Sequence, residues 1–454
     1  MLNQPWLKPV MECSLVSGAL PWMFWILTIA GMIAVLMFLI KEGERKRVII
    51  TLIATVASGA IGYLLTWLCS DVFVVFGVEM GAKVIRAVAI GCAMMALLIC
   101  GIVFLRRWKR ALASVAVVVA LLATCIHVDA IYEEFPTIGS LFGYTGYSRL
   151  SSAKLRKSTM SVKEWKKLAA EGKMPTTPKE GRIYDASIPA AKSGFKVRDA
   201  MVYLPPAALS AEPPELPVME LMAGQPGSPG RFFQASHIKG MLDKYASKHD
   251  GLAPIVISPD QNGSNSNNSL CADTSQGKAE TYLTKDVVDW AKKNLPVSDQ
   301  RWAIGGFSQG GTCATQLGPR HAEQYSLIMA VGGELQPTSG SIEHMVSEYF
   351  NGNKAAYEAQ IPANAIKEHA PSDQVMILGF GALDHQSLTN LETNAKAGIQ
   401  AGMTVTKIKV PDSAHDWHAV QAVLKPTIDW FADMSGLGKM TKAINEYESL
   451  EVLP

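Results

Sequence analysis

Four long apolar runs fill the first 130 residues of the chain and constrain its fold more than any other feature. They cover residues 20–40, 48–68, 84–105 and 111–128, and crossing a bilayer takes about 20 apolar residues. Inside lipid every backbone N–H and C=O must be bonded within the protein, so each run is predicted to be a helix. The first run does not have the form of a cleavable signal peptide, because its apolar core is too long and further runs follow it.

The charges between these runs predict how the chain is oriented. The connectors 41–47 and 106–110 are short and basic, and such loops stay in the cytoplasm. Four spans with both connectors inside place the N-terminus, and everything after residue 128, on the extracytoplasmic side of a bacterial plasma membrane. No Asp, Glu or Lys lies deep in a span. The spans are therefore expected to anchor the chain in membrane lipids rather than to transport an ion.

Charge and motif content exclude several other functions. The net charge is +2, which does not predict binding to nucleic acid. The seven cysteines form no C-x-x-C pair and no zinc spacing, and no Walker loop or dinucleotide fingerprint occurs. No metal and no cofactor is expected.

From residue 181 onward, strand-like apolar runs alternate with helical patterns, which predicts a mostly parallel sheet covered by helices on both faces. The fold class expected is an α/β-hydrolase domain with an eight-stranded sheet, preceded by a four-helix transmembrane domain. The predicted domains are 1–128 (spans), 129–180 (juxtamembrane linker), 181–437 (hydrolase) and 438–454 (C-terminal tail). The predicted strands are 182–188, 200–204, 218–222, 255–258, 302–306, 327–331, 375–380 and 405–410. The first two have no helix between them, which predicts an antiparallel start to the sheet. Helices are predicted near 232–248, 279–294, 312–323, 386–402 and 417–434.

A serine lies between the fifth of these strands and the next helix, in Gly306-Phe-Ser308-Gln-Gly310. This G-x-S-x-G pattern in a strand–turn–helix context is typical of a nucleophile elbow, in which the flanking glycines let strand and helix approach closely. Ser308 is the predicted nucleophile.

A serine hydroxyl needs a base to accept its proton, and that base needs an orienting acid. In this fold the partners follow in the order Ser, acid, His. Asp384 comes just after the seventh strand and His415 just after the eighth. His418 is the rival base, but it would already lie in the last helix. The rival acids Asp373 and Asp412 are less favoured, since Asp373 precedes its strand and so belongs to the wrong edge of the sheet.

An acyl-transfer site also needs N–H donors for the oxyanion. The residue after the nucleophile, Gln309, is one predicted donor. The other should come from the loop after the third strand, residues 223–230. Pro226 has no N–H, so Gln225 is preferred and Gly227 is second. The alternative for this loop is a plain glycine–proline turn.

Three stretches, residues 200–206, 221–227 and 305–313, resemble the putative-esterase family of α/β-hydrolases. That family includes esterase-D-like enzymes, enterochelin esterases and mycolyltransferases of actinobacterial envelopes, and the resemblance covers roughly residues 181–434. It is strongest to membrane-anchored actinobacterial members. It implies an acyl-enzyme mechanism with Ser308 as nucleophile, His415 as base and Asp384 as orienting acid. Mycolyltransferases carry a Glu where Asp384 stands and lack the four spans, which is a departure from that subgroup.

Three further features bear on the site. Cys271 and Cys313 are the cysteines outside the membrane half, and in an oxidising compartment they could form a disulfide; two free buried thiols are the alternative. The polar loop 261–269 is interpreted as a rim of the site. The insertion 342–370 is either a cap over an acyl pocket or a set of packed surface helices.

These features predict a membrane-anchored extracytoplasmic serine hydrolase that cleaves or transfers acyl esters, with an envelope lipid or acylated glycan as substrate. One alternative is a mycolyltransferase-like enzyme that transfers the acyl group to a sugar or lipid acceptor. The other is a non-catalytic envelope binding module, against which the complete set of triad residues argues.

Overall fold

A computed structural model describes residues 6–75, 77–151 and 157–454. The chain forms two compact units. The first contains Met1–Gly146 together with Ser413–Trp417, and the second contains Tyr147–Asp412 and His418–Pro454. The predicted linker 129–180 spans the point where the first unit gives way to the second, and its residues 152–156 lie outside the described part.

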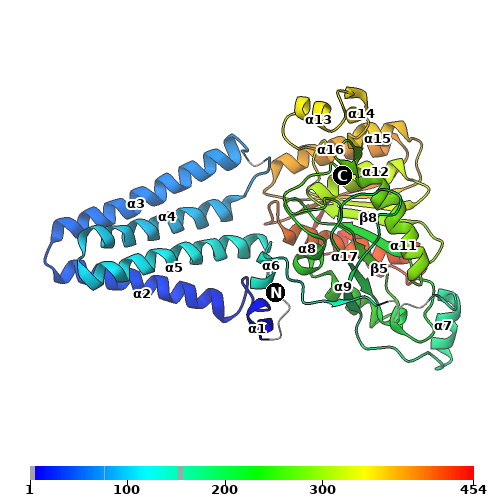
Figure 1. The fold of residues 1–454 in the computed structure, drawn as a ribbon, viewed down its shortest axis with the longest axis horizontal. Helices are drawn as coiled ribbons and strands as arrows, with labels where there is room; N and C mark the ends of the chain where they lie inside the picture. Colours follow the sequence, from blue (N-terminus) through cyan, green and yellow to red (C-terminus); the bar gives the residue numbers. More distant parts are fainter. Residues whose placement is uncertain (1–5, 76, 152–156) are drawn as a thin grey trace. The chain divides into compact units, whose positions relative to one another are not determined.

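Four long helices make up most of the first unit, and each is long and apolar enough to cross a membrane. They are α2 (Ala19–Lys41), α3 (Arg45–Trp67, continued by Leu68–Val72), α4 (Ala82–Phe104) and α5 (Arg107–Tyr132). The four predicted spans coincide with these helices. Helix α3 packs on α4, α4 on α5 and α5 on α2, as the blue and cyan ribbons in Figure 1 show.

Small residues bring these helices together. A Cβ added to Gly31 would lie 2.8 Å from Ala116 Cβ, and one added to Gly91 would lie 2.4 Å from Thr124 Cγ2. Such close helix contacts are the usual mode of packing in lipid, where burying apolar area gives no advantage. The two basic connectors lie at the same end of the bundle, because Lys109 Nζ contacts Glu42 Oε1 at 2.8 Å.

The second unit is built on a ten-stranded sheet in the described residues, with the order β1-β2-β3-β5-β4-β8-β9-β10-β11-β12. All eight predicted strands are present, and the core from β4 to β11 is parallel throughout. As predicted, β2 and β3 form an antiparallel pair; the short strand β1 pairs parallel with β2 outside them. The strands are β1 (Ser148–Arg149), β2 (Arg182–Ala186), β3 (Ala200–Leu204), β4 (Val218–Met222), β5 (Ile255–Ser258), β8 (Trp302–Phe307), β9 (Tyr325–Val331), β10 (Val375–Gly381), β11 (Thr404–Val410) and β12 (Glu451–Leu453).

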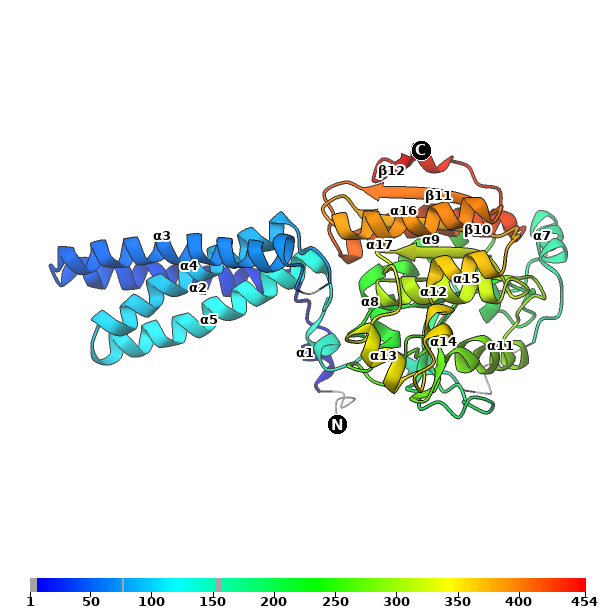
Figure 2. The same cartoon turned by 90° about the horizontal axis from the view of Figure 1, so that it is seen from above.

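Helices cover both faces of this sheet (Figures 1 and 2). A Cβ on Gly379 of β10 would touch Val423 of α17 (Trp417–Met434), whereas Gly398 of α16 (His385–Gln400) packs on Met376. Residues 376 and 379 have opposite parity in β10, so α16 and α17 lie on opposite faces. The apolar side chains between these layers form the core of the unit.

Two segments differ from the sequence-based expectation. Residues 438–454, expected to be a tail outside the hydrolase domain, supply β12, which pairs antiparallel with β11. One long helix was expected over 232–248, but the chain forms α8 (Pro229–Ser236) and α9 (Ile238–Ala246). His237 between them has φ +54°, a left-handed conformation that ends the first helix.

The insertion between β9 and β10 contains three short helices, α13 (Ile342–Glu348), α14 (Lys354–Glu358) and α15 (Pro362–Glu368). Its side chains Met345, Phe350 and Tyr357 form a buried cluster with Leu270 and Ala272. The insertion is thus packed against the loop that follows β5, and both interpretations of it, as a cap or as packed helices, stay open.

Candidate active site

Ser308 stands on a strained turn between β8 and α12 (Gln309–Arg320). Its φ of +55° and ψ of −120° lie outside the regions that a non-glycine residue ordinarily adopts. The neighbouring glycines allow the close approach that holds this turn. A Cβ on Gly310 would lie 2.3 Å from Met222 O, and one on Gly306 would lie 2.4 Å from the carbonyl carbon of Gly310. This geometry is that of a nucleophile elbow.

The loop after β4 lies directly beside the serine. A Cβ added to Gly224 would be 3.2 Å from Ser308 Cβ. The N–H of Gly227 donates to the carbonyl of Asn265 at 3.3 Å, which leaves Gln225 as the better placed of the two predicted donors in this loop. Gln309 is the first residue of α12, so its N–H has no acceptor within the helix. Both predicted oxyanion donors therefore belong to backbone next to Ser308.

Asp384 follows β10 and caps the N-terminus of α16. It is 1 % exposed, and its carboxylate accepts hydrogen bonds from Ser387 N at 3.2 Å and from Ser387 Oγ. The carboxyl ends of β8, β9 and β10 lie side by side in the sheet, since Phe307 pairs with Val331 and Val331 with Gly379. Ser308 and Asp384 therefore leave the sheet at the same edge, with β9 between their strands.

The rival acids occupy different settings. Asp373 lies before β10 and forms a two-pronged ion pair with Arg301, at 2.8 Å for both oxygens. The Arg301 guanidinium holds the pKa of Asp373 below its usual value. Asp373 is therefore a paired surface residue at the opposite edge of the sheet. Asp412 is exposed on a turn with φ +56°.

His415 lies in the loop that runs from the end of β11 to α17, and it is half-buried. The carboxylate of Asp416 organises this loop by accepting bonds from Ser413 Oγ and, at 2.8 Å, from Ala414 N. His418 is exposed and already belongs to α17. Residues Ser413–Trp417 group with the first unit, and the role of His415 as the base stays a prediction.

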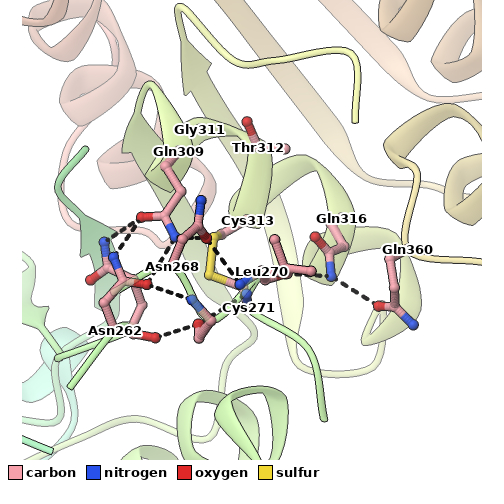
Figure 3. The surroundings of a disulfide bond; sticks show 12 residues. Asn262, Asn268, Leu270, Cys271, Gln309, Gly311, Thr312, Cys313, Gln316 and Gln360 are labelled. Carbon is pink, nitrogen blue, oxygen red and sulfur yellow. Dashed lines mark hydrogen bonds between the residues drawn. A yellow bond between two sulfur atoms is a disulfide. The ribbon is translucent and has the colours of Figure 1, made fainter. Parts of the chain in front are cut away.

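The structure joins Cys271 and Cys313 in a disulfide, which connects the loop after β5 to helix α12 (Figure 3). The same loop places three amide side chains around the side chain of Gln309: the buried Gln261 and Asn262, and the half-buried Asn268. Sequence reasoning described this stretch only as a polar rim. Its four asparagines were the available signal, but their partner lies about 40 residues further along the chain.

Within the described part of the chain, no group of three or more His, Cys, Asp and Glu side chains is arranged to hold a metal ion. A serine hydroxyl on a strained elbow and a buried carboxylate at the same edge of the sheet are groups that a serine hydrolase uses.

Comparison with known proteins defines the family. A family model described as putative esterase matches residues 196–431. An uncharacterized protein of Corynebacterium glutamicum is 32 % identical over 344 residues, covering 72 % of this chain and 77 % of that protein. The chain therefore belongs to the putative-esterase family, and it is an enzyme of the esterase or hydrolase type.

Solved structures of similar proteins cover more than half of this chain. An S-formylglutathione hydrolase from Agrobacterium tumefaciens has a TM-score of 0.47 at 16 % identity, covering 58 % of this chain and 98 % of its own. MPT51 of Mycobacterium tuberculosis gives 0.42 at 14 % identity, with coverage of 56 % and 98 %. The serine hydrolase FphF of Staphylococcus aureus gives 0.40 at 16 % identity, with coverage of 55 % and 98 %.

Proposed function

We propose that the protein is a membrane-anchored serine esterase that cleaves or transfers acyl esters through an acyl-enzyme on Ser308. The observation that carries this proposal is the backbone of Ser308, held at φ +55° between β8 and α12 with Gly224 beside it. Strain of this kind persists only where the surrounding structure enforces it, and it is concentrated at functional sites.

In the proposed mechanism His415 accepts the proton of Ser308 Oγ as that oxygen attacks the ester carbonyl. The negative charge that develops on the carbonyl oxygen is stabilised by the N–H groups of Gln309 and Gln225. The alcohol then leaves with the proton from His415, and the acyl group stays on Ser308. Water, or an acceptor hydroxyl, repeats the sequence in reverse, and Asp384 keeps the imidazole correctly oriented throughout.

The most direct test is labelling with a fluorophosphonate, which reacts with activated serines. The wild type should be labelled and Ser308→Ala should not. Alanine tolerates this backbone no worse than serine, so the fold should be unchanged. Ser247→Ala, at an exposed serine after α9, is the matched control and should label like the wild type. Equal labelling of Ser308→Ala and wild type would remove Ser308 as nucleophile.

The substrate class is proposed from the anchor. Four spans would hold the hydrolase unit near a bilayer, where an amphiphilic ester such as an envelope lipid or acylated glycan is concentrated. The basic connectors and the disulfide support an extracytoplasmic site, because disulfides persist in oxidising compartments.

Sidedness can be tested with introduced cysteines and a membrane-impermeant maleimide on intact cells. Lys354→Cys lies on the exposed start of α14, and Lys46→Cys lies within the first basic connector. The reagent should modify Lys354→Cys in intact cells and Lys46→Cys only after lysis. The reverse pattern would place the hydrolase unit in the cytoplasm.

Hydrolysis and transfer differ in the acceptor. Incubating the enzyme with an ester donor and either trehalose or diacylglycerol distinguishes them, because transfer produces a new ester and hydrolysis only the free acid. Formation of the new ester at the expense of the acid would favour the mycolyltransferase-like alternative.

A further inference from the structure

The loop after β5, residues 260–271, carries many side-chain hydrogen bonds, and we call it the Asn-rich loop. Four of its polar residues are at most 4 % exposed, and they are Asp260, Gln261, Asn262 and Ser269. Burying amide and carboxylate groups is costly unless each finds hydrogen-bond partners. The hydrogen-bond partners of these groups therefore show which parts of the protein the loop positions.

The first group held is the side chain of Gln309, the residue directly after the nucleophile (Figure 3). Asn262 Nδ2 donates to Gln309 Oε1 at 2.8 Å, and Gln309 Nε2 donates back to Asn262 Oδ1 at 2.9 Å. Gln309 Nε2 also donates to Asn268 Oδ1 at 2.8 Å. The reciprocal pair and the third bond fix the Gln309 amide in one orientation. They thereby fix the first residue of α12, whose main-chain N–H is a predicted oxyanion donor.

The second group held is the loop that carries the other predicted donor. Gln261 Nε2 donates to the carbonyl of Ala223 at 2.7 Å, and Gln225 Nε2 donates to the carbonyl of Ser266 at 3.2 Å. With the Gly227 N–H bond described above, the Asn-rich loop holds the 223–227 segment at three points, two on its backbone and one on the Gln225 side chain. One loop therefore contacts both sources of oxyanion donors.

The Asn-rich loop is itself anchored at both ends. At its start, the Asp260 carboxylate accepts from Arg198 Nε at 2.9 Å and from Arg198 Nη2 at 2.7 Å. At its end, Cys271 is bonded to Cys313, which lies one helical turn after Gln309 in α12. The loop and the helix it positions are thus joined covalently within one turn of the proposed oxyanion donor.

We propose that the Asn-rich loop sets the position of the oxyanion hole, with Asn262 as its principal positioning residue and the disulfide as its covalent anchor. The inference rests on the proposed function. Oxyanion donors act over 2.7–3.1 Å, and removing one typically lowers kcat by about 10²–10³-fold. Asn262 bonds the side chain of the donor residue, so it acts through Gln309.

The test compares kcat and KM for ester hydrolysis in three single variants of the full chain. Asn262→Ala removes two of the four side-chain bonds to Gln309 and leaves the longer bond from Gln261, at 3.4 Å, and the bond to Asn268. It should lower kcat by about 10–100-fold, with KM within about threefold of wild type. Asn268→Ala removes one bond and should lower kcat by about 3–10-fold. Asn364→Ala is the matched control, since that exposed amide of α15 donates to the carbonyl of Glu358. It should behave as wild type.

A double-variant cycle that combines Asn262→Ala with Gln309→Ala tests whether the two losses in kcat depend on each other, which a loss of stability alone would not produce. Gln309→Ala keeps the main-chain donor but removes its anchor, so the double variant should be no slower than the slower single variant. The pH dependence of kcat/KM should keep the wild-type midpoint in every variant, because the proposed base is untouched. The proposal would be overturned if the two single-variant losses in kcat multiplied in the double variant, or if Asn262→Ala kept the wild-type kcat.

The disulfide arm uses Cys271→Ala/Cys313→Ala, which should lower kcat by about tenfold with KM little changed. If Asn262→Ala does not fold, the double cysteine variant and Asn268→Ala still test the inference. A wild-type kcat in both would contradict it. Failure of the proposed function has a different signature, namely fluorophosphonate labelling that persists in Ser308→Ala.

Discussion

The two units place opposite kinds of side chain on their surfaces. In the helical unit large apolar residues face outward, with Val56 73 % exposed, while glycine and alanine make contacts between helices. In the hydrolase unit the large residues Trp302 and Tyr325 are fully buried, and the interior also holds polar groups at defined positions. The difference shows that a unit with an apolar exterior, as expected in lipid, relies on small residues for close helix packing, whereas the hydrolase unit relies on apolar burial.

The largest effect expected from this contrast concerns histidines. His415→Ala should lower kcat on the order of 10⁵-fold, because the proposed base is removed. His418→Ala, three residues away and exposed, should stay within about twofold of wild type. His127→Ala in α5, which removes an edge contact with Trp25, should leave the catalytic rate unchanged. Steady-state hydrolysis of a p-nitrophenyl ester measures all three, and a comparable loss in His418→Ala would reassign the base.

The next effect concerns a carboxyl buried within the sheet. Glu220 of β4 is fully buried, accepts one bond from Tyr325 Oη at 2.8 Å, and has a second oxygen, Oε1, with no hydrogen-bond partner among the described residues. Burial raises its pKa to about 8 from 4.5. The unfolded chain releases this proton near pH 4.5 while the folded chain keeps it. Stability should therefore fall as pH rises from about 4.5 to 8, by at most about 1.4 kcal/mol per pH unit, and level off above that.

Glu220→Gln imitates the protonated acid and can still accept from Tyr325. Its stability should lack this pH-dependent loss, so the thermal midpoint of the variant should exceed that of wild type at pH 8 and approach it at pH 5. Thermal unfolding in detergent at both pH values measures the difference. Parallel pH profiles for the two proteins would show that Glu220 does not titrate as stated.

A smaller effect is expected when a lysine is placed on the surface of each unit in turn. Val56→Lys places a charge near the middle of α3 and should cost about 3 kcal/mol for insertion. Ile399→Lys, at a 60 % exposed position near the end of α16, should change stability by no more than about 0.5 kcal/mol. The amount of each protein in carbonate-washed membranes provides the measurement. Equal recovery of both variants would contradict a lipid environment for α3.

The smallest expected effect is a gain in stability. Ser308→Gly relieves the left-handed backbone at the elbow and should be more stable than Ser308→Ala by about 1 kcal/mol, with both variants inactive. Thermal unfolding of the two variants side by side tests this difference. An equal or lower midpoint for the glycine variant would indicate that the turn is not strained in solution.

Much of the architecture was predictable because its signals are local. The bounds of β3, β4 and β5 agree residue for residue with the apolar runs, and α17 begins and ends where the pattern places it. The elbow at Ser308 could be predicted because its glycines stand next to it. Strand β12 could not, since a three-residue strand exists only through pairing with β11.

Other features also depend on tertiary contacts. His237 adopts a conformation that sequence patterns assign to glycine, so the break between α8 and α9 left no signal. The amide pair of Asn262 and Gln309 joins residues 47 apart, and a run of asparagines does not reveal its partner. The candidate site was thus predictable as a set of strand ends, but its supporting hydrogen bonds were not.

The central claim is a covalent acyl-enzyme on Ser308, and rapid-quench intact-protein mass spectrometry during turnover of a p-nitrophenyl ester tests it most directly. The account predicts one acyl adduct per chain in the wild type, located by peptide mapping to Ser308 and missing from Ser308→Ala. An adduct on another residue, or undiminished turnover by Ser308→Ala, would contradict it.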